Sequence, residues 1–253
     1  MFTDVLENAI VKSLPCCHRQ VFFIDNITMW NTRRSRMDRD QISQLQPLKI
    51  CNGWSVVQNN LNSEKRMEEK YELLKLQNEK RNAVIKVIFQ NDQYHLIVAG
   101  LKKDRIYKED SFNEMEQLLE ELEYQIWTVG SGVLEGLQQL SQHVPNFLRL
   151  KIPAGWTVDY ITLKDTDPKT LEENDDAWLF DFNQDLLQIS HKTKNLLLDV
   201  GWYTEGDPTG SYGIELIKNE DWENPLEDIM CTELKELLKQ LDLIFMKEMK
   251  NEF

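Results

Sequence analysis

The amino-acid sequence predicts an α+β protein built from two tandem, diverged repeats, each a mostly antiparallel sheet with a C-terminal amphipathic helix. Three observations predict this fold: a nine-residue motif that occurs twice, a leucine-rich helical segment that occurs twice, and a pair of strand-like runs between them in each half. The chain has 253 residues, which is enough for two ordinary domains.

The first repeated element is a strand that contains the pair Gly-Trp. Residues 48–56, LKICNGWSV, align with residues 150–158, LKIPAGWTV, with six identities and one Ser/Thr exchange in nine positions. The offset between the two copies is 102 residues (150 − 48). We expect Trp54 and Trp156, each following a glycine at the start of a strand, to lie in the core.

The second repeated element is an amphipathic helix. Residues 114–122 and 233–241 both place apolar side chains at i, i+3, i+4 and i+7, and their offset is 119 residues (233 − 114). This spacing is typical of a helix that packs one face on a core. Ser111 and Thr232 precede the two segments and are predicted to be their N-caps.

Between these landmarks, each half contains a predicted β-hairpin. The links between the paired runs are rich in Asn, Asp, Gly and Pro, which are typical of turns. The paired runs are 83–89 with 94–99 in the first half and 195–202 with 212–217 in the second.

The segment before each hairpin differs between the halves. Residues 63–81 are rich in charge, and their apolar side chains recur at near-helical intervals, whereas residues 177–182 and 186–189 predict two further strands. Outside the repeats, the N-terminal residues predict a short helix, a strand and a basic cluster of Arg33, Arg34, Arg36 and Arg39. The predicted organisation is an extension at 1–40, a first repeat at 41–129, a connector at 130–147 and an acidic second repeat at 148–253.

Negative charge is concentrated in the second repeat. The formal charge of the chain is −14, and residues 151–229 alone carry six Lys against eighteen Asp and Glu, a net of −12. Such a field repels nucleic-acid phosphate and accelerates the encounter with a basic protein. We therefore expect a basic protein partner and no nucleic acid, although the charge also serves solubility. The oligomeric state stays open.

The N-terminal sequence and the cysteines indicate a cytoplasmic protein. The opening residues lack the features of a signal peptide, and no apolar run is long enough for a membrane span. Cys16, Cys17, Cys51 and Cys231 are too few and too irregular for a disulfide framework. Cys16-Cys17-His18 has no second pair of ligands, so we expect reduced thiols and no metal site.

No motif predicts catalysis or a cofactor. The chain contains neither a P-loop nor a G-x-G-x-x-G sequence, and its four histidines are scattered without zinc-ligand spacing. Carboxylates are plentiful in the second repeat, but Asp165-Thr166-Asp167 stops short of a calcium loop. We therefore expect no catalytic residue, no metal and no cofactor.

Aromatic side chains embedded in acidic, turn-rich sequence predict a protein-binding surface in the second repeat. Rings supply desolvated anchors, and carboxylates supply steering. For Trp202, core and surface positions are both open, whereas the neighbours of Trp222 favour the surface. The predicted partner-binding residues are Glu172, Asp175, Asp176, Trp202, Tyr203, Glu205, Asp207, Tyr212, Asp221, Trp222 and Glu223.

The second repeat also resembles a known family. The segments LLDVGWY at 197–203, GDPTG at 206–210 and DWENPL at 221–226 make residues 148–245 similar to the small acidic immunity proteins that accompany bacterial polymorphic or contact-dependent toxins. The first repeat lacks these segments. The resemblance implies stoichiometric capture of a toxin domain, often a basic nuclease, by covering its active site.

Three other functions stay open at this point. An acidic nucleic-acid mimic that inhibits a defence nuclease would also need a basic partner. A hydrolase of unfamiliar type would use a carboxylate pair in the second repeat, in a deep pocket that raises their pKa values. A purely structural tandem module would use its charge for solvation alone.

Overall fold

The computed structural model describes residues 41–253 with the exception of residues 43, 63–69, 103–104 and 133–142. The chain divides into two units, Met1–Gln41 and Ile42–Phe253, and every element below belongs to the second unit. The predicted N-terminal helix and strand, the arginine cluster, the Cys16-Cys17-His18 motif and most of the predicted connector lie outside the described residues.

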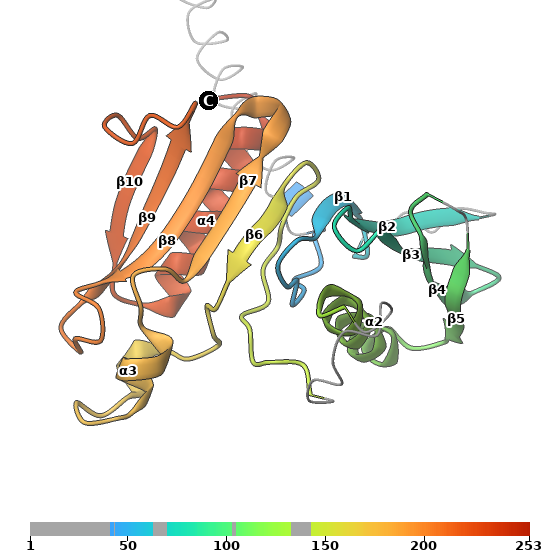
Figure 1. Ribbon diagram of the computed structural model, residues 1–253, viewed down its shortest axis with the longest axis horizontal. Helices are drawn as coiled ribbons and strands as arrows, with labels where there is room; N and C mark the ends of the chain where they lie inside the picture. The colour runs from blue at the N-terminus through green and yellow to red at the C-terminus, as the bar shows by residue number, and fades with distance from the viewer. Residues whose placement is uncertain (1–40, 43, 63–69, 103–104, 133–142) are drawn as a thin grey trace, which may run out of the picture. The chain divides into compact units, whose positions relative to one another are not determined.

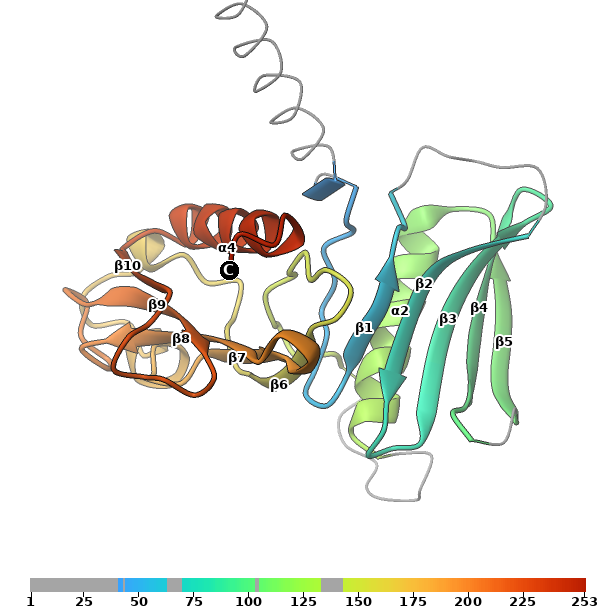
Figure 2. The same ribbon diagram turned by 90° about the horizontal axis from the view of Figure 1, so that it is seen from above.

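Ten strands of the described chain form one antiparallel sheet in the order β10-β9-β8-β7-β6-β1-β2-β3-β4-β5 (Figures 1 and 2). The α+β class is therefore confirmed. The first half, residues 41–132, contains β1 (Ser55–Asn59), β2 (Tyr71–Asn78), β3 (Ala83–Gln90), β4 (Gln93–Gly100), β5 (Ile106–Phe112) and α2 (Met115–Gly130). The second half, residues 143–253, contains β6 (Thr157–Ile161), η2 (Pro168–Thr170), α3 (Ala177–Asp181), β7 (Leu187–His191), η3 (Lys192–Lys194), β8 (Leu196–Tyr203), β9 (Ser211–Lys218), β10 (Glu227–Cys231) and α4 (Leu234–Met249).

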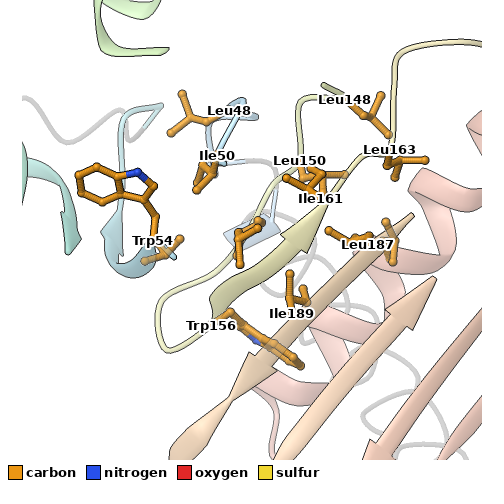
Figure 3. Packing of buried hydrophobic residues seen from close by; sticks show 14 of the residues in the cluster. Leu48, Ile50, Trp54, Leu148, Leu150, Trp156, Ile161, Leu163, Leu187 and Ile189 are labelled. Carbon is orange, nitrogen blue, oxygen red and sulfur yellow. The ribbon is translucent and has the colours of Figure 1, made fainter. Parts of the chain in front are cut away.

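The two halves meet at the centre of the sheet, where β1 lies beside β6. Ser55 is paired with Thr157, and their hydroxyl oxygens are 2.7 Å apart. Leu48 and Leu150 exchange two backbone hydrogen bonds of 3.1 Å. Figure 3 shows the side chains of Leu48 and Ile50 beside Leu150 at this centre. One continuous cluster of buried apolar residues includes members of both halves.

Each long helix covers the strands of its own half (Figures 1 and 2). Both helices were predicted, and each buries leucines of its apolar stripe, Leu118 and Leu122 in α2 and Leu237 and Leu241 in α4. Trp54 and Trp156 are 0% exposed, as expected, and each indole donates a hydrogen bond to a helix. The Nε1 of Trp54 lies 3.0 Å from the Ile126 oxygen, and the Nε1 of Trp156 lies 3.3 Å from Glu248 Oε2.

The strands predicted over residues 48–56 and 150–158 begin later than expected. β1 begins at Ser55 and β6 at Thr157, and only isolated bridges precede them. The interruption is a turn at the glycine of each motif, because Gly53 has φ +86° and Gly155 has φ +98°. Positive φ values break the extended backbone that a continuous strand needs.

Three local predictions were wrong. Ala177–Asp181 forms the helix α3 and not a strand, because Trp178 and Phe182, four residues apart, are the side chains that pack inward. β2 replaces the helical pattern expected near residues 71–76, since pairing with β1 and β3 decides its conformation. The predicted caps at Ser111 and Thr232 are absent: Glu114 and Glu233 occupy the N-cap positions, without a side-chain cap, and the Ser111 hydroxyl bonds His95 instead.

Three other local predictions are confirmed. The hairpins β3–β4 and β8–β9 and the strand β7 are present where they were expected. β5 and β10, which follow the hairpins and form the two edges of the sheet, had not been predicted.

Candidate functional site: an acidic face of the sheet

The predicted partner-binding residues fall into two groups at opposite ends of β9. Glu205 and Asp207 lie in the loop before β9, whereas Trp222 lies in the turn after it. Eight residues of β9 separate the groups, a span of roughly 25 Å at about 3.3 Å per residue. The first group also includes Glu172, Asp175, Asp176 and Tyr203, and the second includes Asp221 and Glu223.

Trp202 and Tyr212 do not belong to any exposed surface. Each is 1% exposed, and together with Trp178 and Phe182 they form a cluster of four packed rings. The indole Nε1 of Trp202 donates a hydrogen bond to the backbone carbonyl oxygen of Asp207 at 3.0 Å. The prediction that these two rings contact a partner is therefore wrong, because both belong to the core.

Asp207 uses its carboxylate inside its own loop. Its Oδ1 accepts hydrogen bonds from the backbone N and the hydroxyl of Thr209, each at 2.8 Å. These two hydrogen bonds lower the pKa of the Asp207 carboxyl below its usual range, and the bond from the Thr209 backbone has the larger effect. This residue organises the loop between β8 and β9, whereas Tyr203 and Trp222 remain 41% and 49% exposed.

Three carboxylates that had not been predicted stand side by side on the open face of the sheet. Asp199 of β8 is paired with Glu215 of β9, and Glu215 is paired with Asp228 of β10. Their neighbours in sequence, such as Leu198 and Leu216, are 0% exposed and point into the core, so the carboxylates point the opposite way. We call Asp199, Glu215 and Asp228 the carboxylate row.

The carboxylate row is electrostatically unfavourable for the protein itself. Burial, followed by the negative charges of Asp228 and Asp199, raises the pKa of the Glu215 carboxyl. Burial also raises the pKa of Asp199, opposed by a 3.1 Å hydrogen bond from Gln188. No Lys or Arg in the described part of the chain forms an ion pair with the row.

An exposed aromatic ring lies next to the row. Gly201 and Gly213 are paired on β8 and β9. A Cβ at Gly213 would lie 2.8 Å from Tyr203 Cε2 and 3.4 Å from the Met230 sulfur. The two glycines therefore make room for the Tyr203 ring to lie across the strands. Met230 is 56% exposed, so an apolar patch of Tyr203 and Met230 adjoins the carboxylates.

The thiols of Cys51 and Cys231 and the imidazole of His191 are other groups with catalytic potential, and all three lie outside the carboxylate row. Burial raises the pKa of the Cys51 thiol to about 12 and that of Cys231 to about 11, so neither is a nucleophile at neutral pH. His191 is buried beside Glu248, with Nε2 3.7 Å from Oε1. Within the described ranges, no three His, Cys, Asp or Glu side chains are grouped to hold a metal ion.

Two hollows lie away from the carboxylate row. One of about 1010 Å³ lies along α2, and one of about 420 Å³ lies between α4 and residues 146–151. Asp199 and Glu215, the carboxyls with raised pKa, line neither of them. The two carboxyls with raised pKa therefore belong to neither hollow.

No family of proteins, curated protein or solved structure matches this chain. Its function is therefore inferred from its own surface. None of the helices in the described ranges has the length and apolarity that crossing a bilayer requires.

The sequence contains a signal for the carboxylate row. Asp199 stands between Leu198 and Val200, and Glu215 stands between Ile214 and Leu216. This alternation places both acids on the outer face of the predicted hairpin. The register of the hairpin, which brings the two acids opposite each other, could not be read from the alternation alone.

Proposed function

We propose that this protein is a non-catalytic acidic binding protein that neutralises a basic toxin domain, such as a nuclease, by stoichiometric capture in the cytoplasm. The carboxylate row carries the proposal. Like charges directly opposite each other on neighbouring strands destabilise a sheet, and a partner that presents Lys or Arg to the row would remove this repulsion on binding. The exposed Tyr203 and Met230 would supply apolar contact beside it.

We also propose that the two halves are diverged copies of one unit. Reciprocal hydrogen bonds at the centre of the sheet support this. The Gly53 amide donates to the Val158 oxygen at 2.7 Å, and the Gly155 amide donates to the Val56 oxygen at 2.8 Å. The two donors are 102 residues apart in the sequence (155 − 53), and so are the two acceptors (158 − 56). This is the offset of the repeated motif.

Strand registers support the same relationship. The β1–β2 ladder has an irregularity between Val56 and Gln58, and the β6–β7 ladder has one between Val158 and Tyr160. These positions again differ by 102 residues (158 − 56 and 160 − 58). Bulges are specific local features of a strand pair, so their occurrence at matching positions favours descent from a common unit.

If the halves are copies, their matching ladders indicate that the shared fold does not need carboxylates on both central strands of this face. One row of paired residues runs outward from Gln58 in the first half, and its counterpart runs outward from Tyr160 in the second. The rows are Gln58, Lys75, Lys86, Ile97 and Glu109, and Tyr160, Gln188, Asp199, Glu215 and Asp228. Lys86 and Ile97 thus stand where the second half has Asp199 and Glu215. This difference supports a role for the acids in binding.

A carboxylate-based hydrolase is the second candidate. The raised pKa values of Asp199 and Glu215 meet one of its requirements. Neither carboxyl lines one of the two hollows described above, however, and a substrate on an open face would stay in water. Capture needs only an open surface and is therefore favoured.

The test uses the basic domain encoded by the reading frame adjacent to this gene. Its affinity is measured by titration calorimetry at several salt concentrations, for the protein and for the variant Asp199→Asn/Glu215→Gln/Asp228→Asn. We expect the variant to bind at least ~10-fold more weakly and with a flatter salt dependence. Its melting temperature should be unchanged or higher, because like charges have been removed.

A matched control removes three negative charges from the first half, in the variant Glu72→Gln/Asp92→Asn/Glu109→Gln. If both triple variants weaken binding equally, total charge and not this face is responsible. Full affinity of the row variant would place the binding site elsewhere. Absence of a basic, toxin-like product next to the gene would remove the immunity function.

A further inference from the structure

Two consecutive apolar side chains are exposed on the one-turn helix α3. Leu179 and Phe180 are each 68% exposed, more than any other large apolar residue in the described chain. Their neighbours Trp178 and Phe182 are 5% and 2% exposed. α3 therefore buries one pair of apolar side chains and presents another to solvent. The exposed pair contributes little to the core, since its area stays in water.

Aromatic packing and hydrogen bonds to neighbouring segments hold α3 in place. The ring of Phe182 lies 4.7 Å from Trp178 and 4.8 Å from Trp202, measured between ring centroids. The Trp178 indole donates a hydrogen bond to the backbone oxygen of Glu172 at 2.9 Å. The Gly206 amide donates one to the backbone oxygen of Phe182, also at 2.9 Å. These contacts fix the backbone of α3 before any partner arrives, which lowers the entropy cost of using its exposed side chains as anchors.

Ion pairing fixes the end of the helix as well. The Asp181 carboxylate pairs with the ammonium group of Lys164, and it accepts a 3.2 Å hydrogen bond from the Thr166 hydroxyl. The side chain of Asp181 is 12% exposed. This carboxylate is thus used within the fold, as is that of Asp175, whose Oδ1 accepts a 2.8 Å hydrogen bond from the Ala177 amide.

Acidic residues predominate in the sequence around the exposed pair, and the ammonium group of Lys164 at the end of α3 is paired with Asp181. Residues 171–185 contain six Asp and Glu and no Lys or Arg. Glu172, Asp175 and Asp176 before the helix are exposed, as is Glu205 in the neighbouring loop. A Cβ at Gly206 of that loop would lie 3.9 Å from the Leu179 side chain. An apolar pair bordered by carboxylates is complementary to an apolar pocket bordered by Lys and Arg.

The segment that follows α3 links the α3 surface to the carboxylate row. The segment between α3 and β7 passes beside the Tyr203 patch, since the Gln184 oxygen lies 1.9 Å from the position of a Cβ at Gly201. The negative charge of Asp185 raises the pKa values of both Asp199 and Tyr203, although burial is the larger cause for each. One partner can therefore contact both regions.

We propose that Leu179 and Phe180 are the apolar anchor of capture and insert into a pocket, bordered by Lys and Arg, on the same basic protein that the carboxylate row attracts. This inference rests on the proposed function and deepens it. The row supplies long-range attraction and orientation, whereas the anchor supplies the buried contact that slows dissociation.

The test measures binding of the variant Leu179→Ser/Phe180→Ser to the basic domain encoded by the adjacent reading frame. We expect a loss of affinity of roughly 100-fold, seen mainly as faster dissociation. The salt dependence of binding should keep the slope of the unmodified protein, because no charge is changed. The variant Leu179→Met/Phe180→Leu, which keeps an apolar surface, should retain most of the affinity.

The matched control is Ile106→Ser/Tyr107→Ser on β5, since these two consecutive residues are 55% and 40% exposed. This control should bind normally. The inference is overturned, with the proposed function intact, if the α3 variant binds as the unmodified protein does. It is also overturned if the α3 variant melts several degrees lower, because the pair would then be part of the fold. If the unmodified protein does not bind the domain, the proposed function and the anchor both fail.

Discussion

Replacing the middle carboxylate of the row should make the protein more stable. Glu215 has a negative charge directly opposite on each side, Asp199 on β8 and Asp228 on β10. The variant Glu215→Gln keeps the size and shape of the side chain and removes both repulsions. Most substitutions destabilise a protein, so a stabilising one is a demanding test of the electrostatic account.

The magnitude follows from the cross-strand geometry. Directly opposite side chains on antiparallel strands have their Cβ atoms about 5 Å apart. At an effective dielectric constant of about 20, two like charges at that distance repel by roughly 3 kcal/mol. Glu215 is partly exposed, so water and salt screen most of this energy. Measured cross-strand pairs are worth about 0.2–1 kcal/mol each, and two pairs predict stabilisation of about 1 kcal/mol at pH 7.

The assay is thermal unfolding between pH 3 and pH 7. Because the folded-state pKa of Glu215 is raised, the folded protein binds this proton more tightly than the unfolded chain does. Its contribution to stability is therefore lost as pH rises from the ordinary glutamate pKa of about 4.3 through the raised folded value. The variant Glu215→Gln lacks this loss. The amount by which it is more stable than the unmodified protein should therefore be near zero at pH 3 and largest at pH 7.

A gain of roughly 2–4 °C in melting temperature corresponds to 1 kcal/mol in a protein of this size. The control is Glu109→Gln on β5, whose partner on β4 is the uncharged Ile97, and it should leave the melting temperature unchanged. Equal effects of the two variants, or destabilisation by Glu215→Gln at pH 7, would refute the claim that the row stores repulsion.

Three further substitutions test the packing of the fold. Gly155→Ala should cost about 3–5 kcal/mol, since its φ is +98° and the new Cβ would lie 2.3 Å from the Nε2 of the buried His191. Gly53→Ala, with φ +86° and its nearest contact at 3.2 Å, should cost about 1–2 kcal/mol in urea unfolding, and equal costs would count against the His191 contact. Glu123→Ala removes a 4% exposed carboxylate that accepts bonds of 2.7 and 2.9 Å from Arg149. Calorimetric unfolding should show a loss of about 2–3 kcal/mol, whereas an unchanged melting temperature would contradict a structural role for this pair.

Sequence reasoning succeeded where a single local signal decides the structure. The hairpin β3–β4 has two apolar runs around Asn91 and Asp92, whose φ values are positive, as a tight turn requires. The helices α2 and α4 repeat their apolar stripe over four turns. Such patterns need no knowledge of the rest of the chain.

Reasoning failed where a distant partner decides the structure. Residues 177–182 contain four bulky apolar side chains, and only the ring cluster contributed by Trp202 and Tyr212 determines that Trp178 and Phe182 turn inward. The same packing removed Trp202 and Tyr212 from the candidate site. The carboxylate row likewise depends on registers between three strands, the last of which, β10, was not predicted.

Solubility alone does not account for where the acids of the second half stand. A charge that only keeps a protein in solution is best placed at an exposed position with an opposite charge nearby, as Glu236 is with Lys239 on α4. Asp199 and Glu215 stand instead on neighbouring central strands of the second half, where burial and adjacent negative charge raise their pKa values. A fold that needed only solvation would lose nothing by exchanging them for the Lys86 and Ile97 of the matching ladder. Their presence side by side on adjacent strands is expected if a cation from outside the chain completes the row.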